Sequence, residues 1–220
     1  MTRLVRRTTM RPRRAAVVLA ACLAVAGLSG CAEERLGSAA VIDDRTISTD
    51  ELQSATQAYL KVVPEGEPGR TQVALLQREI VSSVLDEVAQ EHDVRVREGR
   101  VAAERDDVLQ SVGGRKGLIR TLAQGQPPTV LAPDDVDRWF KDRLLFNGIA
   151  ADICDCPLDP NSQETQQAFM DANDELRKAS ADMNIEVNPR YGTWDPDEGI
   201  TPLVSGGLSR TVDELTGAES

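Results

Sequence analysis

The sequence predicts a mainly α-helical domain over residues 39–195, with a small two-stranded β element that joins the two ends of that domain. Apolar residues recur every three or four positions over long stretches, which is the spacing of one helix face. Short apolar runs near residues 41 and 185 are each bounded by turn-forming residues, which favours strands there. Aromatic residues make up only 3% of the chain, so Val, Leu, Ile and Ala must build the core.

The domain begins with a strand, a turn and a capped helix. Val41 and Ile42 form the strand, and Asp43-Asp44-Arg45 forms the turn. Ser48 and Glu51 have the spacing of a capping box, in which each side chain bonds the other residue's backbone N–H. The helix from about residue 49 to 63 then buries one face, made of Leu52, Ala55, Tyr59 and Val63.

Five further helices are predicted from apolar spacing and from Gly and Pro breaks. The second covers about 70–92 and carries a core stripe of Val73, Leu76, Ile80, Val84 and Val88. The third carries Val101 to Val112, and a short one spans 118–123. The next opens at Pro133 and carries Val136, Trp139, Phe140, Arg143 and Leu144 on one face. The last starts near Asn161, with Glu164 completing a second capping box.

The far end of the domain supplies the second strand. Ile185, Glu186 and Val187 alternate apolar and polar, and Pro189 ends the run because it lacks a backbone N–H. A lone strand leaves its backbone groups unpaired, so we expect this run to pair with Val41-Ile42. Tyr191 and Trp194 should then pack on the helices, with Gly192 permitting the turn between them. Residues 196–220, rich in Gly, Pro, Ser and acids, are predicted to be a flexible tail.

Residues 1–30 have the pattern of a signal peptide. Six arginines and no acid precede an apolar run at 15–28, which is too short to span a bilayer comfortably. That run ends in Leu28-Ser-Gly-Cys31, which resembles the lipobox of bacterial lipoproteins. We therefore expect cleavage before Cys31, diacylglycerol on its thiol, a linker at 31–38, and a protein held at the extracytoplasmic face of the cell membrane. Whether export uses the Sec or the twin-arginine route stays open.

Cleavage would make the chain strongly acidic. The full chain has a formal charge of −11, and losing six arginines leaves 19 basic residues against 36 acids, or −17. Such a domain repels nucleic acid and anionic lipid head groups, so neither is an expected partner.

Two of the four cysteines, Cys154 and Cys156, lie in the stretch Asp-Ile-Cys-Asp-Cys-Pro. A local disulfide, a pair of free thiols and half of a metal site are the three interpretations. The metal is disfavoured because no third Cys or nearby His completes a ligand set, and His92, the chain's one histidine, lies far away in sequence. We expect no metal and no cofactor.

The order of these pieces over residues 39–149 resembles the N-terminal domain of the SurA and PrsA foldases. Val41, Ile47, Ser48, Glu51 and Leu52 match that family's opening strand and first helix, although Asp43-Asp44 replaces the usual Asn-Gly. The long second helix also resembles the family's, and the trigger-factor peptide-binding module is similar. The resemblance implies an extracytoplasmic chaperone-like domain that binds unfolded or exported polypeptide segments.

The chain departs from these foldases in one respect that bears on catalysis. They often insert a parvulin prolyl-isomerase domain after the helical module, whereas residues 151–161 here join two helices directly. We therefore expect no isomerase activity and no catalytic residues. Tyr59, Trp139 and Phe140 are the candidate peptide contacts because aromatics are scarce, with burial in the core as the plainer alternative. A structural lipoprotein that uses the same scaffold for one fixed envelope partner is the other hypothesis.

Overall fold

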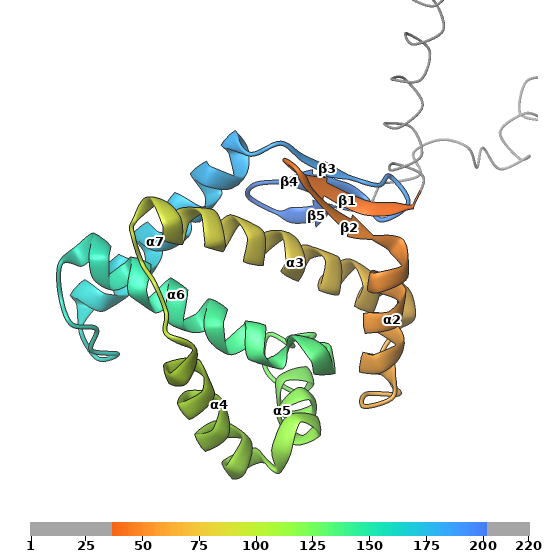
Figure 1. Ribbon diagram of the computed structural model, residues 1–220, viewed down its shortest axis with the longest axis horizontal. Coiled ribbons are helices and arrows are strands. Elements are labelled where there is room, and N and C mark those ends of the chain that lie inside the picture. The colour runs from red at the N-terminus through yellow and green to blue at the C-terminus, as the bar shows by residue number, and fades with distance from the viewer. Residues whose placement is uncertain (1–36, 202–220) are drawn as a thin grey trace, which may run out of the picture. The chain divides into compact units, whose positions relative to one another are not determined.

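The computed structural model describes residues 37–201, and within them it is mainly helical, as the sequence predicts (Figure 1). The strands are β1 (Ser38–Ile42), β2 (Arg45–Ser48), β3 (Ile185–Val187), β4 (Thr193–Asp195) and β5 (Gly199–Thr201). The helices are α2 (Thr49–Leu60), α3 (Pro68–Glu91), α4 (Glu98–Val112), α5 (Gly114–Ala123), the 3-10 turn η1 (Pro133–Asp135), α6 (Val136–Cys154) and α7 (Gln163–Asp182).

Strand β1 joins the two ends of the domain, which confirms the predicted pairing. It runs antiparallel to β3, with Ile42 opposite Ile185 and Ala40 opposite Val187. The element is larger than predicted, because β1 also pairs with β2 and the sheet has the order β2-β1-β3. The turn between β1 and β2 closes with Asp43 at φ 48°, a left-handed conformation that Asp tolerates better than most residues.

The chain continues past β3 into a second hairpin, β4–β5. Tyr191 is buried against the main core, and Gly192 turns at φ 130°, as expected. The Trp194 indole N–H donates to Ser180 Oγ at 2.9 Å, which ties the hairpin to α7. The predicted tail boundary at residue 196 is wrong, because Ile200 of β5 is buried in the same core. The Gly- and acid-rich composition hid this strand, which is only three residues long.

Helix caps explain where α2 and α7 begin. The predicted capping box is present at α2: Glu51 N–H donates to Ser48 Oγ at 3.1 Å, and Ser48 N–H donates to Glu51 Oε2 at 3.2 Å. At α7 the predicted box is wrong by one residue. Ser162 is the cap and accepts from the Thr165 N–H at 3.3 Å.

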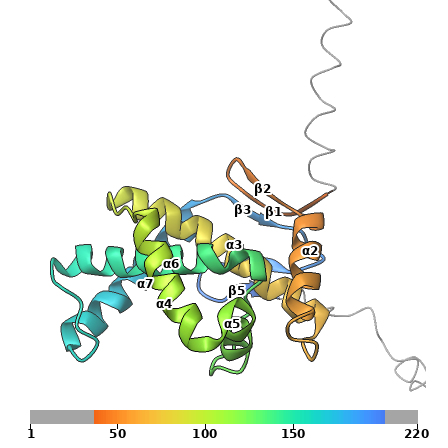
Figure 2. The same ribbon diagram turned by 60° about the horizontal axis from the view of Figure 1, so that its bottom comes forward.

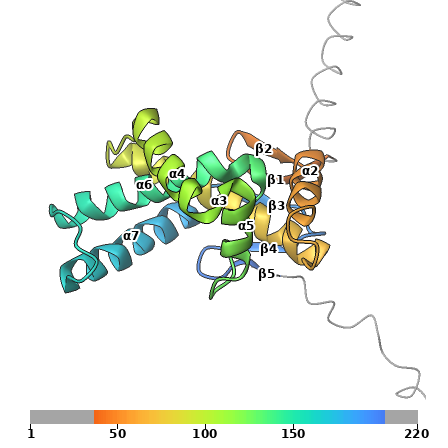
Figure 3. The same cartoon turned by 90° about the horizontal axis from the view of Figure 1, so that it is seen from below.

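Helix α3 is central to the main core. The sheet β2-β1-β3 lies on one side of it and α6 on the other, while α7 runs alongside α6 (Figures 1 and 3). Its predicted stripe is buried at Leu76, Ile80, Val84 and Val88. Helices α4 and α5 form a pair on the side away from the strands (Figure 2). A second core cluster forms there, from residues of α2, α5 and α6 and of the segments beside them: Tyr59, Val62, Val63, Leu118, Ile119, Leu131, Val136 and Phe140.

Candidate functional site

Of the three aromatic residues expected to contact peptide, Trp139 lines a cavity, whereas the other two are buried. Tyr59 and Phe140 are buried in the second core cluster, so that expectation is wrong for both, and the plainer core interpretation holds. Trp139 packs edge-on against Phe140, with ring centroids 4.8 Å apart, and stays partly exposed. The Arg143 guanidinium lies 5.1 Å from the centroid of the Trp139 ring, within the range of a cation–π contact.

Trp139 lines what we call the central groove, a cavity of about 560 Å³ between α3, α6, α7 and the segment 128–130. Figure 3 shows α3, α6 and α7, the three helices whose residues line it. Val81 of α3 lines the groove, and 42% of its surface is exposed. Besides Val81 and Trp139, the apolar residues that line it are Ala74, Leu85, Pro128, Val130, Phe146 and Leu176.

Neutral polar side chains accompany this apolar surface. Gln77, Asn147, Asn173 and Thr129 also line the central groove. The Asn173 amide N–H donates to the Phe169 carbonyl at 2.8 Å, which fixes its orientation along α7. Amide side chains both donate and accept hydrogen bonds, as the backbone of an extended peptide does. The groove therefore offers an apolar surface together with amide groups that can hydrogen-bond a peptide backbone, whatever the sequence of that peptide.

An ion cluster joins α3 to α6, and three of its members, Arg78, Ser82 and Asp142, line the groove. Asp142 accepts hydrogen bonds from Ser82 Oγ at 2.5 Å and from Arg138 Nε at 2.8 Å, and it pairs with Arg78 at 3.4 Å. Arg138 also reaches Asp86 at 2.7 Å. Burial lowers the pKa of Arg78, and the charge of Asp142 opposes that shift. The cluster holds in register the two helices that form the groove's walls.

A second cavity, of about 600 Å³, lies between β2, α2, α3 and η1, and Asp135 is on its wall. Burial, followed by the negative charge of Glu79, raises the pKa of Asp135 to about 6, although Arg78 opposes the shift. The folded protein therefore holds this proton more tightly than the unfolded chain, in which an Asp titrates near a pKa of about 4.

We expect Asp135→Asn to stabilise the protein at pH 7.5 and to change little near pH 4. The raised folded-state pKa means that ionisation penalises the folded state above about pH 6, whereas below about pH 4 the carboxyl is neutral in both states. After allowance for partial exposure, the gain at pH 7.5 is about 1 kcal/mol. Melting temperatures of both proteins at the two pH values check this, and an equal difference at both would contradict it.

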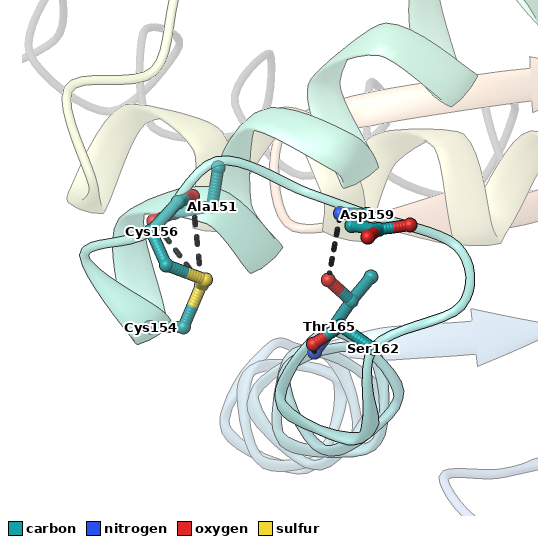
Figure 4. The surroundings of a disulfide bond; sticks show 6 residues. All are labelled: Ala151, Cys154, Cys156, Asp159, Ser162 and Thr165. Atoms are coloured by element: carbon teal, nitrogen blue, oxygen red, sulfur yellow. Dashed lines mark hydrogen bonds between the residues drawn. A yellow bond between two sulfur atoms is a disulfide. The ribbon is translucent and has the colours of Figure 1, made fainter.

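The two described cysteines form a disulfide between the last turn of α6 and the loop that follows (Figure 4). This is one of the three interpretations that the sequence left open. Cys154 Sγ lies 3.6 Å from the carbonyl oxygens of Ala151 and Cys156. Asp155, the residue between the two cysteines, ends α6 in a left-handed conformation at φ 47°. Within residues 37–201 no group of three or more His, Cys, Asp or Glu side chains is placed to hold a metal ion.

The loop after the disulfide is tied to the start of α7. The Asp159 N–H donates to Thr165 Oγ1 at 2.9 Å (Figure 4).

His92, at the end of α3, lies 2.7 Å from the Asp152 carboxylate of α6, so it links two helices. Cys31, the expected lipid site, lies outside the described residues.

Sequence reasoning missed most of the groove. One signal was available: Val81 is apolar but lies just outside the buried stripe of α3, next to Ile80, as a residue of a binding surface would. Asn173 and Leu176 come from α7, and Val130 comes from a segment without regular structure. Nothing in their spacing indicates that these residues meet the α3 and α6 side chains.

Comparisons with known proteins assign no family: no protein-family model, no curated protein and no solved structure matches this chain. In the part of the chain that the structure describes, none of the helices has the length and apolar character needed to cross a membrane.

Proposed function

We propose that this protein is a lipid-anchored, extracytoplasmic chaperone-like protein that binds unfolded or exported polypeptide segments in the central groove. The observation that carries the proposal is the groove itself, with Val81 exposed in it and Trp139 on its wall. Open apolar surface of this kind marks binding sites in soluble domains, because exposing it to water is unfavourable.

The chemistry of the groove favours an unfolded polypeptide over a compact ligand. Apolar side chains of a client would contact Val81, Trp139 and Phe146, while its backbone would find the amides of Asn147 and Asn173. These contacts select for apolar content and an accessible backbone, and not for one sequence. That is the selectivity expected of a chaperone-like protein.

The resemblance to the SurA and PrsA foldases supports the same function but accounts for only part of the groove. It covers residues 39–149, which include α3 and most of α6 but none of α7. The groove proposed here also needs Asn173 and Leu176 of α7. We propose binding without isomerase activity, because the short connection from α6 to α7 leaves no room for a parvulin domain there.

Binding to several unrelated unfolded proteins tests the proposal. Permanently unfolded chains, such as reduced and carboxymethylated α-lactalbumin, should bind, compete with one another for one site, and aggregate more slowly in its presence. A standard proline-peptide assay should show no rate enhancement. Failure of all unrelated chains to bind would overturn the proposal and leave the hypothesis of a single fixed envelope partner.

We expect Cys31→Ser to release the protein from the cell membrane. The substitution removes the thiol that takes the diacylglycerol, and the −17 charge of the processed chain gives it no attraction to anionic lipids. Cell fractionation and intact-mass spectra check this. A wild-type mass that retains residues 1–30 and carries no acyl group would contradict it.

A further inference from the structure

A third cavity continues the central groove across α3 and α7. We call it the Trp194 cavity; its volume is about 390 Å³. The two cavities share four lining residues: Gln77, Val81, Asn173 and Leu176. The surface is therefore one extended groove. The chain's two tryptophans line its two parts, with Trp139 on α6 and Trp194 on the β4–β5 hairpin.

The two parts of this extended groove differ in charge. Arg78, Asp142 and Arg143 line the central groove, which gives an excess of one positive charge. Arg177, Asp197 and Glu198 line the Trp194 cavity, which gives an excess of one negative charge.

The carboxylate at Glu198 is the source of the negative excess. Arg177 is already paired with Asp174 and Asp197. Glu198 is exposed, and it forms no ion pair with another described residue. Its backbone N–H donates to Asp195 Oδ1 at 2.9 Å, so the turn that carries it is held in place.

We propose that the groove prefers extended polypeptide segments with apolar side chains at the centre and a Lys or Arg at the end that lies on the Trp194 cavity. This inference rests on the proposed function and names the client's chemistry. The apolar residues lie over Val81 and Leu176, which belong to both cavities. The cation lies beside the Trp194 ring and the Glu198 carboxylate, which combines a cation–π contact with an ion pair.

The position of Trp194 suits this role. Its indole N–H is bonded to Ser180, so the ring is held in one orientation while part of it remains exposed in the cavity. The charge of the whole domain acts in the same direction, because a strongly acidic protein attracts basic segments and repels acidic ones.

Three labelled peptides with one apolar core, Leu-Phe-Leu, test the proposal on the full chain. They carry a pair of Lys, Ser or Glu residues at the C-terminus of the core, and a second set of three carries the same pairs at its N-terminus. We expect the Lys peptide to bind about three- to tenfold more tightly than the Ser peptide at low salt, with the Glu peptide weakest. Added salt should reduce the differences. Glu198→Gln should bring the affinity for the Lys peptide close to the affinity for the Ser peptide.

Glu87→Gln is the matched control, because Glu87 is exposed on α3 and lines neither part of the groove. It removes the same charge and should leave the Lys preference intact. Equal binding of the three peptides, or an equal effect of Glu198→Gln and Glu87→Gln, would overturn the charge preference. Binding of the Ser peptide would in that case still support the proposed function. Failure of every peptide to bind would overturn both.

Discussion

Ending the chain at Asn184 is expected to lower the melting temperature by about 10 °C or more relative to a chain that ends at Thr201. The truncation removes β3, and with it the ladder between β1 and the end of the domain. It also removes Tyr191 and Ile200 from the main core. Burial of each such side chain is worth about 1.5–3 kcal/mol, so these two alone account for about 3–6 kcal/mol.

The chains ending at Asn184 and at Thr201 differ only by the segment that contains β3, β4 and β5, so their difference in melting temperature isolates the contribution of these strands to stability. Thermal unfolding followed by circular dichroism gives both midpoints. Equal midpoints would show that the sheet and the second hairpin add nothing to the fold, and would contradict the pairing of the two ends of the domain.

Asp142→Ala is expected to destabilise the protein by about 3 kcal/mol, the cost typical of breaking a buried ion pair by removing one partner. The Asp142 side chain is only 13% exposed, and it holds Arg78, Ser82 and Arg138 together. Without this carboxylate, the charges of Arg78 and Arg138 are less well neutralised. Helices α3 and α6, which form two walls of the groove, should then also lose their register. Urea unfolding measures the change in free energy.

Asp174→Ala is the control for Asp142→Ala. Asp174 pairs with Arg177 on the surface of α7, and its side chain is 50% exposed. Exposed pairs contribute little, so this change should cost less than about 1 kcal/mol. A loss at Asp142 no larger than the loss at Asp174 would show that the ion cluster does not hold α3 against α6.

Local signals in the sequence were enough to predict the helices and the closing strand. The Ser48–Glu51 cap, the buried stripe of α3 and the alternation at Ile185–Val187 each act within one element, so each could be read from spacing alone. The β5 strand could not, because three residues with Gly and Thr at the ends carry no periodicity. Its place in the fold depends on Ile200 meeting a core formed by distant residues.

The groove depended still more on tertiary structure. Trp139 and Phe140 are neighbours in sequence and equally apolar, yet α6 turns one into the core and the other toward the cavity. One residue of helix rotation, about 100°, decides between the two roles. Sequence spacing alone could not place that boundary, because both positions are compatible with the same apolar face.

The most direct test of the central claim compares Val81→Glu with Met170→Glu. These two residues are the exposed large hydrophobics of the described part, at 42% and 54%, but only Val81 lines the groove. We measure the affinity of each variant for a labelled unfolded polypeptide, together with its melting temperature. Burying the new carboxylate under a bound client is costly, so Val81→Glu should weaken binding about tenfold or more, with Met170→Glu unchanged and both variants stable. Wild-type affinity in Val81→Glu, or an equal loss in Met170→Glu, would contradict binding in the central groove.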